Sequence, residues 1–163
     1  MATYVPINFR LEEFFPKKYY EEIFPVYKYR MWTIIDERIK MAVQRIRDLH
    51  GPMIMNTWYK QSLIDKWGYY ESRGYRPHDD DDVQTSKCPF YGNISQHRFG
   101  RAADLKPVDV TAEYIRKHMR ENPKHPAYEG ITRVEDTLKG KPITWLHIDC
   151  ADTGGTQVIF LQL

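Results

Sequence analysis

Two histidines and one aspartate in this sequence are candidates for metal chemistry. His97 and Asp104 lie in the segment SQHRFGRAAD (95–104), and His147 lies in ITWLHID (143–149). Neutral imidazoles and a carboxylate are the ligands of many catalytic zinc ions, which keep a fourth position open for water. The same set is also consistent with polar groups that only satisfy one another's hydrogen bonds on neighbouring strands.

Two extended strands would bring these side chains together. Gly100 precedes the strand that contains Asp104, and it removes a side chain that would crowd a loop folding back over the Asp104 face. Alternation along the second strand places His147 and Asp149 on one side. If the two strands are neighbours, we expect His97, Asp104 and His147 to meet on one face of a sheet.

The longer pattern resembles the signature of the zinc D,D-peptidases and L-alanyl-D-glutamate peptidases, relatives of VanX, of phage endolysins and of the hedgehog signalling domain. That signature is Ser, any residue, His, two of any, Gly, any, Ala, any, Asp. Its five fixed positions are matched by Ser95, His97, Gly100, Ala102 and Asp104. TWLHID is similar to the closing motif of that family, and the resemblance covers about residues 33–150. It implies a Zn²⁺ ion held by His97, Asp104 and His147.

An arginine of the reaction is implied by the same resemblance. The family has a turn like Ser-Gly-Tyr-Arg upstream of the metal motif, and here residues 72–76 read SRGYR. Arg76 would then bind the scissile carbonyl or a carboxylate of the substrate. A guanidinium can donate two parallel hydrogen bonds to such an oxyanion.

The general base is the point at which the sequence departs from the family. Many members have Asp or Glu three residues before the last His, and here that position is Thr144, which cannot accept a proton near neutral pH. We expect Glu135 or Asp149 to act as the base instead. Asp149 is equally suited to orient His147, and Glu135 to form an ion pair with Arg133 or Arg76.

Hydrophobic periodicity predicts the supporting elements. A helix is indicated over residues 33–50, with Thr33 and Asp36 as a capping-box-like start, and a second helix over 111–120. Strands are indicated at residues 53–58, 101–106, 131–135, 143–149 and 157–161. This order is typical of an α+β fold, and the resemblance implies the hedgehog/DD-peptidase-like arrangement of a central antiparallel sheet with flanking helices.

The whole chain, 1–163, is predicted to be one domain. Residues 1–32 form an aromatic N-terminal extension, which we expect to pack on the sheet, with a partner-binding surface as the alternative. Cys88 and Cys150 are predicted to be reduced thiols, and Cys150 to be a buried thiol on the face opposite His147 rather than a fourth ligand.

Other polar residues are given ordinary roles. The run from His78 to Asp82 is predicted to be a solvated loop, with a calcium site as the minor alternative. The histidines outside the zinc motif are expected at the surface: His50, His78, His118 and His125.

Composition restricts the class of protein. The net charge of +2 and the pI near 8.4 are too mild for a protein that binds a phosphate backbone, so we expect no nucleic acid partner. No apolar run is long enough for a membrane helix, and the first ten residues lack the pattern of a secretory signal peptide. We therefore expect no membrane partner. For a chain without a secretory signal, the resemblance to the zinc peptidases implies a location in the host cytoplasm or in the virion of a phage.

Two functions follow from these expectations. The first is a zinc-dependent peptidase that hydrolyses peptide bonds in the stem peptides of bacterial peptidoglycan. The alternative is a non-catalytic structural or binding protein of a virion that retains the fold and the zinc site and contacts other virion proteins. Thr144 favours the alternative, whereas retention of Arg76 together with all three metal ligands favours the enzyme.

Overall fold

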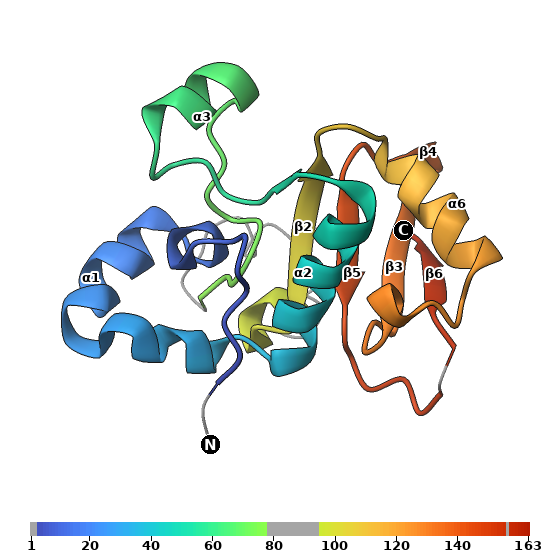
Figure 1. The fold of residues 1–163 in the computed structure, drawn as a ribbon, viewed down its shortest axis with the longest axis horizontal. Coiled ribbons are helices and arrows are strands. Elements are labelled where there is room, and N and C mark those ends of the chain that lie inside the picture. The colour runs from blue at the N-terminus through green and yellow to red at the C-terminus, as the bar shows by residue number, and fades with distance from the viewer. Residues whose placement is uncertain (1–2, 78–94, 156) are drawn as a thin grey trace.

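The computed structural model describes residues 3–77, 95–155 and 157–163 (Figure 1). The run from His78 to Asp82 and Cys88 lie outside the described residues. Within them, six strands form one sheet and four α-helices surround it, which confirms the α+β class.

The sheet has the strand order β1-β2-β5-β3-β4, and β6 pairs with β3. All neighbours are antiparallel except β3 and β6, which are parallel, so the sheet is mixed at that edge. The order makes β2 and β5 central neighbours although they are far apart in the sequence. The strands are β1 (Met53–Ile54), β2 (Ala102–Pro107), β3 (Arg133–Leu138), β4 (Lys141–Pro142), β5 (Leu146–Asp149) and β6 (Ile159–Gln162).

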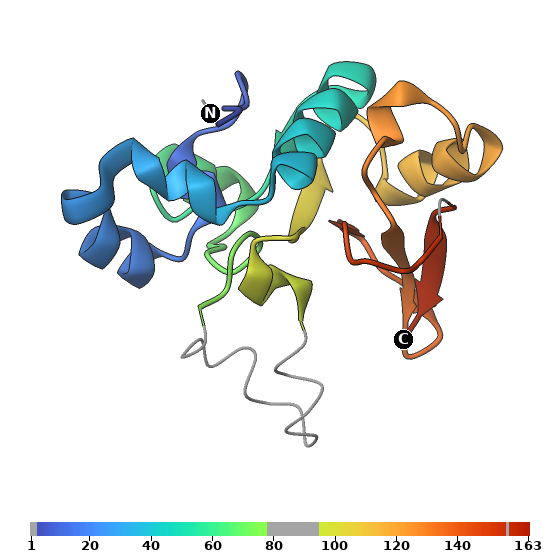
Figure 2. The ribbon, with the colours of Figure 1, turned by 90° about the horizontal axis from the view of Figure 1, so that it is seen from below.

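The helices cover one face of this sheet and its β1 side. In Figure 2, α2 and α6 lie on one side of the strands, whereas the short helix η3 lies on the other. The N-terminal helices form a group beside β2 (Figure 1). The helices are η1 (Leu11–Phe14), α1 (Lys17–Tyr27), η2 (Lys28–Ile34), α2 (Glu37–His50), α3 (Gln61–Trp67), η3 (Gln96–Phe99), α6 (Ala112–Glu121) and η4 (Pro126–Tyr128).

Capping side chains determine where the two predicted helices begin. The helix predicted from Thr33 begins later, at Glu37, because the carboxylate of Asp36 accepts a hydrogen bond from the backbone N–H of Arg38 at 3.0 Å. Thr33 lies instead in η2. The second helix begins as predicted, since the hydroxyl of Thr111 accepts from the N–H of Tyr114 at 3.1 Å.

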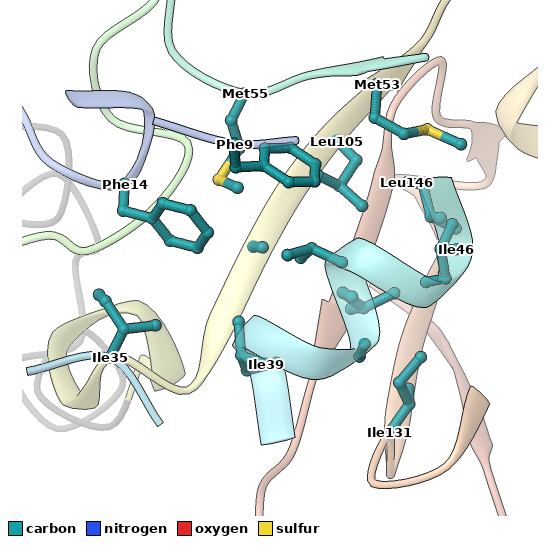
Figure 3. Close-up of a cluster of buried hydrophobic side chains, with 14 of the residues drawn as sticks. Phe9, Phe14, Ile35, Ile39, Ile46, Met53, Met55, Leu105, Ile131 and Leu146 are labelled. Carbon is teal, nitrogen blue, oxygen red and sulfur yellow. The ribbon is translucent and has the colours of Figure 1, made fainter. Parts of the chain in front are cut away.

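The hydrophobic core lies between α2 and the sheet. Ile39 and Ile46 of α2 face Leu105 of β2 and Leu146 of β5, and all four side chains are fully buried (Figure 3). Cys150 joins the same core, as predicted, and burial raises the pKa of its thiol to about 12. The residues that alternate with Leu105 and Leu146 therefore lie on the opposite face of the sheet, which does not pack against α2.

The aromatic N-terminal segment belongs to the same buried core as Leu105 of β2. Phe14 and Trp32 are buried and pack edge to face, with ring centroids 5.1 Å apart. Phe15 and Tyr19 pack on Tyr75, with centroids 5.7 and 5.2 Å away. The segment therefore supports the SRGYR turn that contains the predicted arginine.

The strands predicted at 53–58 and 131–135 have different bounds in the structure. The strand predicted at 53–58 ends at Ile54, because the side chain of Asn56 bonds to other loops instead, donating to Phe15 O and accepting from Arg73 N. The strand predicted at 131–135 begins at Arg133, and Ile131 lies in the core before it.

His50 is buried rather than exposed. Its Nε2 lies 2.7 Å from the hydroxyl of Tyr128, which also lies 2.6 Å from Nδ1 of His118. The sequence pattern gave no indication of this cluster, because Tyr128 is far from His50 along the chain. Burial lowers the pKa of His50, so the neutral imidazole is favoured in the fold.

Arg116 connects α6 to the chain that leads into β5. Its buried guanidinium donates to the carbonyl oxygens of Ile143 and Trp145 at 2.8 and 3.0 Å and contacts Asp136 at 3.4 Å. We expect Arg116→Met to lower the free energy of unfolding by about 3 kcal/mol, because these acceptors would stay buried without a donor. Urea denaturation measures this change.

The adjacent Lys117 provides a matched control for that experiment. Its side chain is 69% exposed and pairs with Glu121 at 3.7 Å. Lys117→Met should change the free energy of unfolding by less than about 0.5 kcal/mol. Equal effects of the two substitutions would contradict the role assigned to Arg116.

Glu13 makes the stability of the fold depend on pH. Burial raises the pKa of its carboxyl from 4.5 to about 7, although the N–H of Arg10 donates to it at 3.0 Å. The unfolded chain releases this proton near pH 4.5 but the folded chain only near 7, so the fold loses stability as the pH rises between these values. The loss is on the order of 3 kcal/mol above pH 7.

Glu13→Gln should remove this dependence. We expect the variant to have a higher free energy of unfolding than the native chain at pH 8 and the same value at pH 4. Urea titrations at the two pH values test this, and a variant that is destabilised at pH 8 would show that the ionised carboxylate is satisfied in the fold.

Candidate metal centre

The register of the two central strands places the first two candidate ligands opposite each other. Asp104 of β2 pairs directly with His147 of β5. Ala103 and Leu105 point to the other face and are fully buried in the core. Packing of these apolar residues against α2 therefore fixes the face on which Asp104 and His147 lie.

His97 reaches the same place from η3, the short helix before β2. The chain turns at Gly100, which has a left-handed backbone (φ +64°). A Cβ at this position would overlap the carbonyl oxygen of Ile34. The glycine is thus required by its φ angle and by close packing on Ile34, which differs from the predicted reason, room over the sheet face.

The three side chains form one compact group of donor atoms. Nδ1 of His147 lies 2.7 Å from Oδ1 of Asp104 and 3.3 Å from Nε2 of His97. Nε2 of His97 lies 3.5 Å from Oδ2 of Asp104. One ligand atom from each residue lies within 4.8 Å of the others, and all three residues are buried, so the group could hold a metal ion.

Outer hydrogen bonds orient both imidazoles for this role. Nδ1 of His97 lies 2.6 Å from the carbonyl oxygen of Gly74. Because a carbonyl only accepts, Nδ1 carries the proton and Nε2 presents its lone pair to the group. Nε2 of His147 lies 3.4 Å from Oδ2 of Asp149, which leaves Nδ1 on the side of Asp104. Such partners are typical of metal-bound histidines.

The charges in the group also fit a cation. Burial favours a neutral acid, but attraction to His97 and a hydrogen bond from His147 hold the pKa of Asp104 well below its usual range. Burial lowers the pKa of His97, which favours the neutral imidazole that a metal ligand requires. Burial opposes the imidazolium of His147, yet hydrogen bonds to Asp104 and Asp149 raise its pKa to about 10. A divalent cation would replace that proton.

Arg76 lies beside the group, as the resemblance implied. Its Nη2 donates to Oδ2 of Asp104 at 2.8 Å, and its Nε donates to the carbonyl of Ser72. Gly74 permits this turn, since a Cβ there would overlap the carbonyl oxygen of Phe14. The backbone N–H of Arg76 also donates to the carbonyl of His97 at 3.1 Å, which joins the turn to η3.

The two candidate bases have different surroundings. Asp149 is buried and receives hydrogen bonds from Nε and Nη2 of Arg133 at 2.8–3.0 Å. Glu135 lies 3.9 Å from Nε2 of His147, and its side chain is 22% exposed. Among the described residues no arginine forms an ion pair with Glu135, since Arg133 binds Asp149 and Arg76 binds Asp104.

Both acids border a cleft of about 320 Å³ that contains the candidate metal ligands. Leu161 and Leu163 at the C-terminal end contribute apolar surface to it. Thr144, the position of the family's usual acid, is exposed and does not line this cleft. Glu135 of β3 therefore supplies a carboxylate to the cleft where the sequence motif does not.

No protein-family model matches the chain, and neither the curated proteins nor the solved structures contain a match. Within the described residues, no helix is both long and apolar enough to cross a membrane.

Several residues of the site had no signal in the sequence. The carbonyl of Gly74 orients His97, but backbone acceptors cannot be recognised from residue type. For Glu135 an ion pair with Arg133 or Arg76 was left open as an alternative, and the position of Arg133 directly opposite Asp149 follows only from the register of β3 and β5. Knowledge of strand pairing, rather than of further motifs, would have identified it.

Proposed function

We propose that this protein is a zinc-dependent peptidase that hydrolyses peptide bonds in the stem peptides of bacterial peptidoglycan. The observation that carries the proposal is the group of His97, Asp104 and His147, with its donor atoms within 4.8 Å of one another and its imidazoles oriented from outside. The similarity of SQHRFGRAAD, SRGYR and TWLHID to the zinc D,D-peptidases supports the choice of zinc and of this substrate. A phage-associated location is part of the same proposal.

Nε2 of His97, Nδ1 of His147 and the carboxylate of Asp104 would hold the zinc ion. Two nitrogens and one oxygen form a ligand set that suits zinc. When bound, zinc would polarise the peptide carbonyl and acidify a water molecule. With Asp104 engaged in this way, the guanidinium of Arg76 can turn its donors to the oxyanion that develops on the scissile carbonyl.

Glu135 is the proton acceptor in this proposal. Its carboxylate lines the cleft, and burial raises its pKa, which brings it closer to neutral pH where a base is most effective. Asp149 is a weaker base, because hydrogen bonds from His147 and Arg133 outweigh its burial and lower its pKa. Asp149 instead holds His147 in orientation.

Digestion of purified peptidoglycan tests the proposal. Peptidoglycan incubated with the zinc-loaded protein should yield new stem-peptide fragments by mass spectrometry, and a chelator should abolish them until zinc is restored. The masses of the fragments identify the bond that is cut. A protein that binds one zinc ion but produces no fragments would disprove peptidase activity on this substrate.

A second candidate is a binding protein of a virion that retains the site without turnover. The observation that favours it is the exposure of apolar side chains near the end of α1, where Val26 is 74% and Tyr29 is 72% exposed. The peptidoglycan experiment separates the two functions, since only the peptidase generates fragments.

A further inference from the structure

A second cleft continues from the candidate metal centre. It has a volume of about 370 Å³ and shares Arg76, Asp104 and Trp145 with the cleft that contains Glu135. The two clefts therefore adjoin each other at Asp104, one of the candidate metal ligands. A peptide cut at the metal centre must extend to both sides of its scissile bond, so the second cleft is placed to bind a neighbouring part of the same ligand.

Arg73 is the cation of this second cleft that would contact a ligand. Its guanidinium lies 3.5 Å from the centroid of the Tyr70 ring, a contact that fixes the plane of its donors. Its backbone is fixed as well: the N–H donates to Asn56 at 2.9 Å, and the carbonyl accepts from the N–H of Asp104 at 2.7 Å. Arg73 is thus a rigid cation beside a candidate metal ligand.

This cation has no carboxylate partner within residues 3–77, 95–155 and 157–163. Among the described residues none forms an ion pair with Arg73, and its Nη1 is buried without a hydrogen-bond partner. Asp104, an acid of the same cleft, is already bound by Arg76 and His147.

The other groups in the cleft suit an amino acid residue. Tyr69, Tyr70 and Trp145 contribute aromatic surface. Glu71 accepts a hydrogen bond from the hydroxyl of Tyr69 at 3.0 Å and retains acceptor capacity for an N–H of a ligand. A ligand residue that carries a free carboxylate would place that carboxylate at Arg73 and its own peptide N–H near Glu71.

We propose that the cleft around Arg73 is a subsite for a free carboxylate of the peptide ligand, adjacent to the metal centre. The guanidinium of Arg73 binds the carboxylate, while Arg76 remains available to the scissile carbonyl. This inference rests on the proposed function for its ligand, a peptide with carboxylates close to the cut bond. It assigns to Arg73 a role in selecting substrates and not in the chemical step.

Amidation of single carboxylates tests the subsite. The probes are a synthetic stem pentapeptide, L-Ala–D-Glu–L-Lys–D-Ala–D-Ala, in which D-Glu is linked to L-Lys through its γ-carboxyl, and two forms of it with the D-Glu α-carboxylate or the C-terminal carboxylate converted to an amide. Calorimetry on zinc-loaded Glu135→Gln protein measures their binding without turnover. We expect one of the two amides to bind about 10- to 100-fold more weakly than the parent peptide.

Arg73→Gln in the same background should remove that discrimination, so that the parent peptide and this amide bind equally. Arg73→Lys, which keeps the charge but not the paired donors, should give an intermediate ratio. Arg45→Gln is the control, since Arg45 pairs with Glu129 and lines neither cleft. It should leave the ratio unchanged.

The outcomes separate this inference from the proposed function. If the native protein cleaves the pentapeptide but Arg73→Gln discriminates between carboxylate and amide as well as before, the subsite is wrong and the peptidase stands. If binding depends on Arg73 and the carboxylate but no cleavage occurs, the subsite stands and the peptidase is wrong. If none of the three peptides binds, both are overturned.

Discussion

Glu135→Gln should lower kcat for cleavage of peptidoglycan stem peptides by about 100- to 10,000-fold, the usual contribution of a general base. The amide has nearly the same shape as the carboxylate but cannot accept a proton from water. Glu135 is not one of the three donor residues, so the variant should still bind one zinc ion per chain. Steady-state kinetics and elemental analysis of the same preparation measure both quantities.

Asp149→Asn is the matched comparison, because Asp149 is the other acid beside His147. Its carboxylate lies 3.4 Å from Nε2 of His147, so its loss should weaken zinc binding by about 10- to 100-fold, as loss of such outer partners does elsewhere. Excess zinc should therefore restore much of the activity of Asp149→Asn and none of that of Glu135→Gln. The reverse pattern would identify Asp149 as the base.

His97→Ala should reduce the zinc content of the purified protein far below one ion per chain, because it removes one of the three proposed ligands. The same change should abolish stabilisation by zinc. A native chain at a free zinc concentration 100 times its Kd gains about 2.7 kcal/mol of stability, which thermal melts with and without zinc detect. The melting temperature of the variant should not change when zinc is added.

His125→Ala controls for a nonspecific effect of removing a histidine. Nδ1 of His125 accepts a hydrogen bond from the N–H of Ala127 at 3.2 Å, and His125 lies in the separate cluster around Tyr128. This variant should bind zinc as the native chain does. If His125→Ala lost zinc while His97→Ala retained it, the metal would belong to the Tyr128 cluster.

Much of the site could be predicted because alternation along a strand is a local property. The apolar residues Ala103 and Leu105 fix the face of Asp104, and the same period fixes His147 and Asp149 on β5. The pairing of these two strands did not follow from periodicity, since it depends on packing between residues about 40 positions apart. The pairing of β2 with β5 was assumed only because the proposed metal site requires it.

Other features depend on contacts that no short segment encodes. Asn56 ends the first predicted strand by bonding to Phe15 and Arg73, and the buried position of His50 depends on Tyr128. The aromatic residues before position 33 lacked periodicity because they lie in several short helices and pack on different partners. Their role in supporting the SRGYR turn could be found only in three dimensions.

The most direct test of the metal centre is anomalous diffraction at the zinc edge from crystals of the protein grown with zinc. The account predicts one strong peak among Nε2 of His97, Nδ1 of His147 and the carboxylate of Asp104, with Asp104 turned from Arg76 toward the ion. A peak in the cluster of His50, His118 and Tyr128, or no ordered zinc at either place, would contradict it.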